Sequence, residues 1–256
     1  MERNTVVCAE ALDWLRGLPE GSVDVFWSSP PYNLADRLRG GNSVQTKVRH
    51  AYAGGGARGD GTLMPEADYQ AEQAAVLTEW HRCLAPDGVA FYSHKVRIKD
   101  GEAISPLRWI YRTPLVVLQE LVWDRGGTAN VDDRRFLPVS ERVYVLARRP
   151  GLRLANRDRL PDVLRFAPTH HKRATSGHPC PTHPGLVVAC LQTVPPLPDG
   201  CPRLVADCYM GSGTTAVVAR SLGMHYAGCD RSAEYVALAQ RNLGAPLQPA
   251  LLALAG

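Results

Sequence analysis

Four polar residues follow apolar runs that read as buried strands, and their chemistry suits a ligand site. These residues are Glu10, Ser29, Asp207 and Asp230. In open sheets of parallel strands, ligands bind outside the carboxyl ends of the strands. Three carboxylates and one hydroxyl at such an edge could accept hydrogen bonds from an amine or from ribose hydroxyls. We therefore look for the elements that would bring the four together.

Asp207 is followed by a glycine-rich turn, Cys-Tyr-Met-Gly-Ser-Gly-Thr-Thr, which leads into a predicted helix. Gly211 and Gly213 allow the backbone to turn tightly and to approach a ligand closely. A P-loop is excluded because no lysine follows the second glycine. The dinucleotide-binding fingerprint G-x-G-x-x-G has a glycine at the position that Ala216 occupies. NAD is therefore a weaker alternative than an adenosyl cofactor. A plain strand-to-helix turn is the non-functional interpretation.

For an adenosyl cofactor, the two aspartates have separate expected roles. Asp207, directly at a strand end, could hold a cationic amine. Asp230 ends the next predicted strand, where a carboxylate accepts hydrogen bonds from ribose hydroxyls. This pairing favours an adenosyl cofactor with an amino-acid moiety.

A second motif, Ser29-Pro30-Pro31-Tyr32, comes directly after the apolar run VDVFWS. Two prolines stop further strand pairing and make the corner rigid, because proline has no N–H and a fixed φ. The Ser29 hydroxyl and the Pro30 carbonyl could each accept one hydrogen of a nucleobase amine. Such preorganised acceptors would stabilise charge that develops as the amine attacks. Tyr32 could stack on a base flipped from its duplex.

The order of the two motifs resembles the β-group of DNA amino-methyltransferases, which methylate cytosine N4 or adenine N6. The resemblance covers most of the chain, from CAEALDWLRGLPEGSVDVFWSSPPYN through LVWDRGG, SERVYVLARRP and GHPCPTHPGLV to DCYMGSGTT and YAGCDRSAEY. It implies that the catalytic residues are Ser29, Pro30, Pro31 and Tyr32. For S-adenosylmethionine it implies a larger set: Glu10, Asp207, Tyr209, Met210, Gly211, Ser212, Gly213, Thr214, Thr215 and Asp230, with His178, Pro179, and Thr182 or His183 from the His-Pro segment.

Serine in the first catalytic position is more frequent in the cytosine-N4 enzymes of that family. We therefore expect transfer of a methyl group from S-adenosylmethionine to cytosine N4 in double-stranded DNA, by base flipping and direct transfer. Adenine N6 is the first alternative. RNA or protein amine methyltransferases rank lower, since their corner generally follows the glycine segment and begins with asparagine. A non-catalytic DNA-binding protein that binds the cofactor is the remaining alternative.

These motifs need a frame that places their strands side by side. Residues 5–10, 23–29 and 89–94 read as strands, residues 66–85 as a helix ended by Pro86-Asp87-Gly88, and residues 201–243 as strand, turn, helix, strand and helix. Alternation of this kind predicts an α/β fold with a doubly wound, mostly parallel sheet. The resemblance specifies a Rossmann-like methyltransferase core in permuted order, as a single domain over residues 1–256.

Three loops are candidates for DNA contact and target recognition: 36–66, 125–138 and 148–177. Arginines and lysines gather in them, which suits a polyanionic partner, although solvated faces explain such charge equally well. The net charge of the whole chain is only +4. The expected partner is double-stranded DNA, and the resemblance leaves open a homodimer and a cognate restriction endonuclease.

Composition places the chain in a cytoplasm. No run reaches the length of a membrane span, and the first residues lack a signal-peptide core. The count of 7 cysteines is odd and their spacing irregular, which favours reduced thiols. The histidine and cysteine cluster before the last strands does not have standard zinc spacing, so we expect no metal there. Its members are His170, His171, His178, Cys180 and His183.

Overall fold

The computed structural model describes residues 2–33, 64–128, 133, 135–167, 178 and 181–245. Within them an eight-stranded sheet has the order β1-β10-β9-β2-β3-β7-β6-β8. All neighbouring pairs are parallel except those made by β7, which is antiparallel to β3 and β6. The strands are β1 (Thr5–Cys8), β2 (Val23–Ser28), β3 (Leu84–His94), β6 (Val116–Asp124), β7 (Ser140–Ala147), β8 (Val163–Arg165), β9 (Leu204–Asp207) and β10 (His225–Asp230).

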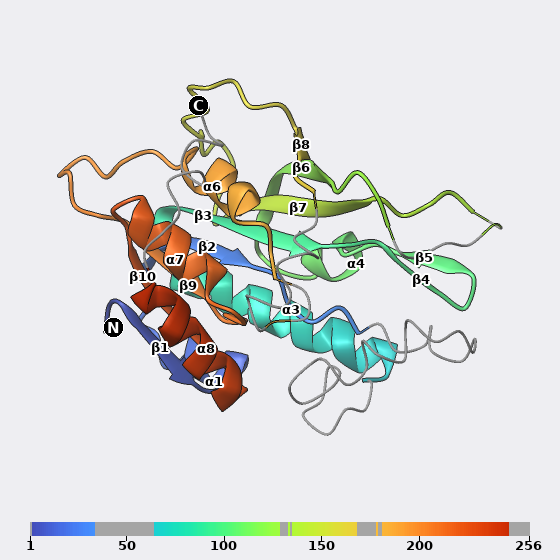
Figure 1. Cartoon of the computed structure of the whole chain (residues 1–256), viewed down its shortest axis with the longest axis horizontal. Coiled ribbons are helices and arrows are strands. Elements are labelled where there is room, and N and C mark those ends of the chain that lie inside the picture. Colours follow the sequence, from blue (N-terminus) through green and yellow to red (C-terminus); the bar gives the residue numbers. More distant parts are fainter. Residues whose placement is uncertain are drawn as a thin grey trace.

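Helices cover both faces of this sheet (Figure 1). One face carries α1 (Ala11–Arg16), α3 (Glu66–Cys83) and α4 (Leu107–Ile110). The other carries α6 (Pro184–Leu191), α7 (Thr214–Ser221) and α8 (Ala233–Gly244), which follow one another along the sheet in Figure 1. The predicted doubly wound α/β fold is therefore confirmed.

The central strand β2 shows why the sequence is apolar on successive positions. Phe26 packs toward α3, where its ring stacks on Trp80 with centroids 4.7 Å apart. Val25 and Trp27 pack on the opposite face with α6 and α7. Side chains of a strand point alternately to the two faces, so a strand covered on both sides is apolar throughout.

Several predicted element boundaries change in the structure. The helix ends at Cys83, and residues 86–88 lie within β3 rather than in a turn between helix and strand. The pairing of β3 with β2 shifts register there, from Val23 opposite Leu84 to Val25 opposite Val89. Gly88 permits this irregular stretch, because a Cβ at that position would lie 3.0 Å from the Asp24 carbonyl oxygen.

Three short strands do not follow from the sequence pattern. Residues 148–177 are predicted as a loop, yet Val163–Arg165 pair with β6 as the edge strand β8. The strands β4 (Arg97–Lys99) and β5 (Glu102–Ile104) form a separate hairpin after β3. Each of the three has only 3 residues, too few to show a periodic pattern.

Chain direction decides which loops meet the carboxyl ends of β2, β3, β9 and β10. The connection from β6 to β7 begins and ends at this edge, because Asp124 pairs with Ser140 there. The segment after β7 starts at the opposite edge, where Ala147 pairs with Val89. It returns to the first edge through β8, whose last residue, Arg165, pairs with Asp124. The predicted loop 36–66 lies outside the described residues apart from 64–66.

In the described part, no helix is both long and apolar enough to cross a membrane.

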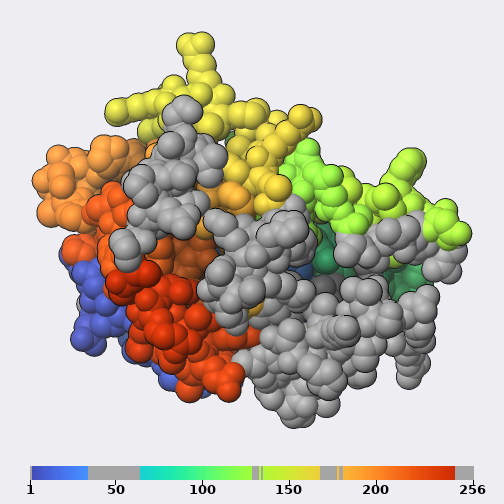
Figure 2. Space-filling model, viewed as in Figure 1, coloured from blue at the N-terminus to red at the C-terminus, as the bar shows by residue number. Residues whose placement is uncertain are grey.

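Figure 2 shows the segment after β7, in yellow, projecting from the upper rim of this face of the molecule. Its exposed arginines are Arg149, Arg153, Arg157, Arg159 and Arg165.

Candidate active site

The ends of β2 and β9 are joined by a buried hydrogen bond. Ser28 Oγ donates to Asp207 Oδ1 at 2.5 Å, and both residues are almost fully buried. The Asp207 carboxylate also accepts hydrogen bonds from the Tyr209 backbone N–H at 2.9 Å and the Thr215 hydroxyl at 2.7 Å. Burial raises the pKa of Asp207 to about 6, although these donors oppose the shift. Of about four acceptor positions on a carboxylate, three are therefore filled by the chain itself.

The glycine turn is held in a conformation that only glycine adopts easily. Gly211 and Gly213 have φ values of 51° and 83°. A Cβ on Gly213 would lie 2.9 Å from Ala239, so glycine also lets α7 approach α8. Asp230 Oδ2 accepts from the Gly211 N–H at 2.8 Å, which fixes the turn against the end of β10.

Asp230 and Glu10 stand side by side at the ends of neighbouring strands. The Ala9 N–H donates to the Asp230 carbonyl at 3.1 Å, and Glu10 begins α1 as its N-cap residue. Glu10 is exposed, and Asp230 is partly exposed. Burial raises the pKa of Asp230. Each Asp230 oxygen accepts one backbone N–H, from Gly211 or Ser232, which leaves acceptor capacity for ligand hydroxyls.

Other predicted cofactor residues surround the turn. The Tyr209 hydroxyl accepts from Gln73 at 3.1 Å, and Met210 is buried in the core beneath the turn. Ser212 Oγ lies 3.3 Å from Thr214 Oγ1, and its carbonyl accepts from Asn242. Thus the segment around Gly211 and Gly213 is tied to three surrounding helices, α3, α7 and α8.

The His-Pro segment reaches the glycine turn through His178. A Cβ on Gly211 would lie 3.2 Å from His178 Nε2, and the His178 ring lies 4.7 Å from that of Tyr235. His183 has a different place: its Nδ1 accepts the Gly185 N–H as the N-cap of α6, and its ring stacks on Phe166. Thr182 precedes it and is partly exposed. The predicted residue Pro179 lies outside the described residues, as do His170, His171 and Cys180.

The Ser-Pro-Pro-Tyr corner extends from the end of β2 at the same edge. Ser29 and Tyr32 are partly exposed, and Pro30 is buried. Ser29 Oγ lies 3.0 Å from Tyr32 Oη, which donates to Glu141 Oε2 at 2.9 Å. Burial, followed by the nearby Glu141 charge, raises the pKa of Tyr32 well above its ordinary value. Tyr32 is therefore a protonated phenol at neutral pH.

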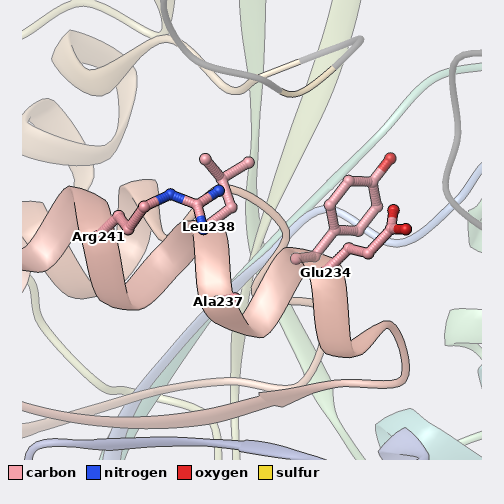
Figure 3. Close-up of a pocket in the computed structure, with 5 residues that line it drawn as sticks. Glu234, Ala237, Leu238 and Arg241 are labelled. Atoms are coloured by element: carbon pink, nitrogen blue, oxygen red, sulfur yellow. The ribbon is translucent and has the colours of Figure 1, made fainter.

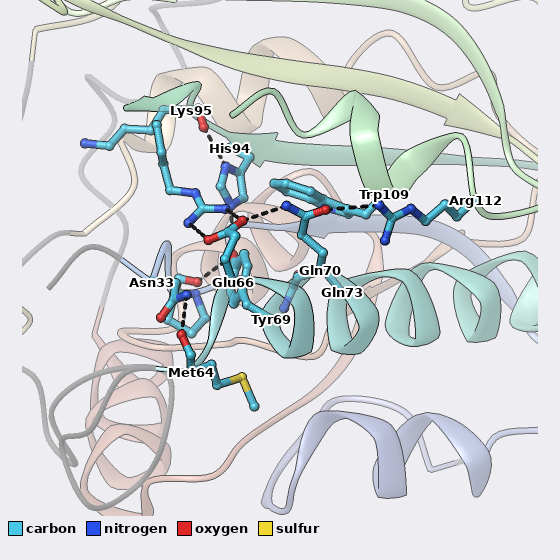
Figure 4. A network of polar contacts seen from close by, with 12 residues as sticks. Asn33, Met64, Glu66, Tyr69, Gln70, Gln73, His94, Lys95, Trp109 and Arg112 are labelled. Carbon is cyan, nitrogen blue, oxygen red and sulfur yellow. Dashed lines mark hydrogen bonds and ion pairs between the residues drawn. The ribbon is translucent and has the colours of Figure 1, made fainter. Parts of the chain in front are cut away.

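The backbone of the corner is braced from α3. Tyr69 is buried, and its hydroxyl donates to the Pro31 carbonyl at 2.8 Å. The same oxygen lies 2.8 Å from His94 Nε2 (Figure 4). Burial lowers the pKa of His94 to about 3, so the imidazole is neutral. The His94 ring also packs 4.4 Å from the Tyr32 ring, which fixes the tyrosine plane.

The two ends of the 34–63 segment are joined beside this corner. Asn33 Nδ2 donates to the Met64 carbonyl at 3.0 Å. The next helix begins at Glu66, whose two oxygens accept from Arg97 at 2.8 and 2.7 Å. Figure 4 shows both contacts next to Tyr69 and His94. The hydrogen bond therefore holds Asn33 and Met64 together beside Tyr32.

Sequence reasoning singled out neither Ser28, Tyr69 nor Glu141. Their bonds to Asp207, Pro31 and Tyr32 cross between elements far apart in the chain, so no local spacing shows them. Glu141 carried one usable signal, a carboxylate inside the apolar strand pattern SERVYVLA. Glutamate is almost never fully buried unless it is paired.

A hollow on α8 is lined by Glu234, Tyr235, Ala237, Leu238 and Arg241 (Figure 3). None of these five residues is a predicted site residue. Over the stretches of chain that the structure describes, no three His, Cys, Asp or Glu side chains are grouped to hold a metal ion.

The residues at the turn fit an adenosyl cofactor. Gly211 faces His178 without a side chain, leaving backbone accessible, and the partly exposed Asp230 carboxylate keeps free acceptor capacity. The Glu10 carboxylate is exposed beside it. This donor and acceptor set matches a ribose and a nucleobase better than a pyrophosphate, since it offers two carboxylates.

Known proteins resemble this chain in sequence over most of its length. Residues 23–241 match the family model described as DNA methylase. The Type II methyltransferase M.BglII from Bacillus subtilis is 24% identical over 272 aligned positions, which cover 94% of this chain and 69% of that enzyme. The Type II methyltransferase M1.MboII from Moraxella bovis is 67% identical over 33 residues, which cover 13% of this chain and 13% of that enzyme.

Solved structures share the fold at low sequence identity. The PvuII DNA methyltransferase, described as cytosine-N4-specific, superposes with a TM-score of 0.72 and 15% identity, over 100% of this chain and 92% of that one. The M1.HpyAVI–SAM complex gives a TM-score of 0.63 and 15% identity, over 94% of this chain and 99% of that one.

Proposed function

This chain belongs to the DNA methylase family, and we propose that it transfers a methyl group from S-adenosylmethionine to the N4 amine of cytosine in double-stranded DNA. The observation that carries the proposal is the joining of two sites at one sheet edge. The corner that would hold the amine and the turn that would hold the cofactor are linked directly by the Ser28–Asp207 hydrogen bond.

The cofactor site is assigned to the turn and the strand ends around it. Asp230 is the proposed acceptor for the ribose hydroxyls, and Glu10 contacts the adenine. The amino-acid moiety lies against the turn at Gly211 and Gly213, with His178 and Thr182 beside it. His183 is committed to capping α6, which favours Thr182 as the ligand-facing residue of that segment. When bound, S-adenosylmethionine supplies a methyl group that is already activated by the positive sulfur.

At the corner, the chain poses the target amine. Ser29 Oγ and the Pro30 carbonyl accept the two amine hydrogens, which makes the nitrogen lone pair available for in-line attack. The prolines and the Tyr69 bond to the Pro31 carbonyl keep these acceptors from reorganising. Tyr32 stacks on the flipped base, its plane held by His94. Proximity of two bound reactants supplies much of the rate.

DNA contacts are assigned to the edge that carries the corner. Phe136, in the predicted segment 125–138, is 100% exposed, and Leu137 next to it is 49% exposed. An exposed aromatic side chain beside a base-flipping site could fill the gap in the stack. Arg165 approaches the same edge, and the 34–63 segment begins there at Asn33. The rest of the basic stretch 148–162 begins at the opposite edge, so its arginines have a smaller proposed part.

The cytosine preference is supported by serine in the first catalytic position and by the likeness to a cytosine-N4-specific enzyme. Type II methyltransferases among the relatives support a role beside a restriction endonuclease in a bacterial cytoplasm.

The test is to incubate the protein with labelled S-adenosylmethionine and unmethylated duplex DNA of mixed sequence, and to digest the DNA to nucleosides. We expect N4-methyldeoxycytidine from the native protein and little from Ser29→Ala. Labelled N6-methyldeoxyadenosine would support the proposed methyl transfer but would contradict the assignment of cytosine as the target base. Absence of any labelled nucleoside, with cofactor bound, would overturn the function.

A further inference from the structure

The hydrogen bonds around Tyr32 run in one direction. Tyr32 Oη donates its single hydrogen to Glu141 Oε2 at 2.9 Å. A phenol has only one hydrogen to donate. The contact of 3.0 Å between Ser29 Oγ and Tyr32 Oη must then use the Ser29 hydrogen. The chain therefore runs from Ser29 through Tyr32 to Glu141.

We propose that Glu141 is a positioning residue that makes Ser29 a pure acceptor toward the target amine. With its own hydrogen committed to Tyr32, Ser29 Oγ presents only lone pairs to the site. Linked hydrogen bonds polarise one another, so the remote carboxylate also increases the electron density on that oxygen. Glu141 thus provides, through Tyr32, the negative charge that an aspartate in the position of Ser29 would provide directly.

The surroundings of Glu141 hold its side chain in place. The residue is only 6% exposed, and Arg125 Nη1 donates to its Oε1 at 2.7 Å. The Arg125 guanidinium lies over the Trp123 ring, 5.4 Å from its centroid. One carboxylate oxygen serves Arg125 and the other serves Tyr32, so both acceptors are needed. Arg125 opens the 125–138 segment, which connects the proposed DNA-contacting loop to the corner.

Glu141→Gln tests this arrangement with little change of shape. A glutamine has only one oxygen acceptor, and this oxygen would accept the hydrogen bond from Arg125. The NH₂ group of the glutamine would then face Tyr32. The Tyr32 hydrogen must then point at Ser29, and the Ser29 hydrogen turns toward the site. The inference rests on the proposed methyl transfer, so the native protein is assayed first and its failure would overturn the function itself.

The rate assay compares four variants with the native protein under single turnover, with labelled S-adenosylmethionine and duplex DNA. We expect Glu141→Gln and Tyr32→Phe each to slow methyl transfer about 10- to 100-fold, the range seen when a supporting partner of a reactive group is removed. The double variant should be no slower than Tyr32→Phe, because the carboxylate acts through the hydroxyl. Glu120→Gln is the matched control, because it removes the ion pair that Glu120 makes with Arg142 between β6 and β7. The Glu120 side chain is 40% exposed, and this variant should transfer methyl groups at the native rate.

A second readout needs no turnover. In protein labelled with ¹³Cζ tyrosine, the Tyr32 resonance, assigned by its loss in Tyr32→Phe, reports whether the phenol donates to a carboxylate. We expect it to move upfield in Glu141→Gln and to stay in Glu120→Gln. An active native enzyme whose Glu141→Gln variant keeps its rate within twofold, or whose losses multiply in the double variant, would overturn the inference. An unmoved Tyr32 resonance would overturn it equally.

Discussion

The Ser28 hydroxyl donates a 2.5 Å hydrogen bond to Asp207, although the two residues are 179 positions apart in the chain. Ser28 is the last residue of β2 and Asp207 the last of β9, and the two strands pair in parallel. The catalytic corner begins at the next residue after Ser28. The cofactor turn begins at the next residue after Asp207. The bond therefore fixes the distance between the two halves of the proposed site.

Ser28→Ala should destabilise the protein and weaken cofactor binding. It leaves a buried carboxylate with one donor fewer, which costs about 1–3 kcal/mol. The lost bond served the ionised form, so the pKa of Asp207 should rise further. The free energy of unfolding by urea should consequently fall more at pH 8 than at pH 5. An equal loss at both pH values would contradict the assignment.

Asp207→Asn should remove a specific pH dependence of stability. The folded pKa of Asp207 is raised to about 6, above the ordinary value of 3.8. Between these values the folded state binds more protons than the unfolded state, so stability declines as pH rises from about 4 to 6. The difference in unfolding free energy between the native protein and the variant should decline over that window by on the order of 3 kcal/mol.

This comparison is needed because His94 acts in the opposite direction. Its folded pKa, about 3, is below the ordinary 6.5, so its contribution is lost as pH falls through that range. Asp207→Asn retains His94, and subtracting the two curves isolates Asp207. A flat difference curve from pH 4 to 7 would show that the carboxyl is not buried as described.

Asp230→Ala should weaken binding of S-adenosylmethionine by about 10- to 100-fold, since it removes charged acceptors from the proposed ribose site. Asp230→Asn keeps one oxygen that can accept the Gly211 N–H. Its affinity for S-adenosylmethionine should therefore lie between those of the native protein and Asp230→Ala. Calorimetry measures the affinities, and thermal melting checks the fold. Unchanged affinity in a folded Asp230→Ala protein would remove the cofactor assignment.

Gly213→Ala should cost more stability than Gly223→Ala, although both glycines have positive φ. At Gly213 a Cβ would lie 2.9 Å from Ala239, whereas at Gly223 nothing lies within 4 Å. The backbone strain is about 1–2 kcal/mol in each case. Overpacking between α7 and α8 adds about 1–3 kcal/mol only at Gly213. Urea unfolding measures both, and equal losses would contradict the close packing of these helices.

Phe136→Ala should weaken binding of duplex DNA about tenfold, as expected when one stacking side chain is lost. Stability should not change, because Phe136 is 100% exposed. Tyr111→Ala is the matched control: Tyr111 is also an exposed aromatic residue, at 69%, and it lies outside the three predicted DNA-contacting segments. Fluorescence anisotropy measures both affinities. Equal effects of the two changes would exclude a specific contact by Phe136.

The sequence by itself determined the fold class and the identity of both motifs. Consecutive apolar residues such as the VFW of VDVFW predicted a buried strand, and glycines after Asp207 predicted the tight turn. These features are local, because side-chain alternation and backbone freedom act over a few residues. The strand ends at Ser28, Asp207 and Asp230 follow from the same local patterns, within one residue of the predicted ends.

Only the tertiary structure decided which side chains act on those motifs. Ser28 reaches Asp207, Tyr69 reaches Pro31, and Glu141 reaches Tyr32 through contacts between elements 38 to 179 residues apart. Such partners depend on strand order, chain direction and register, which no window of the sequence contains. Strand direction likewise put the two ends of the β6–β7 connection at the edge of the site, and the start of the basic stretch after β7 at the other edge. Packing thus selected a few positions among many similar glutamates, tyrosines and arginines, because a hydrogen bond requires its two atoms to meet within about 3 Å.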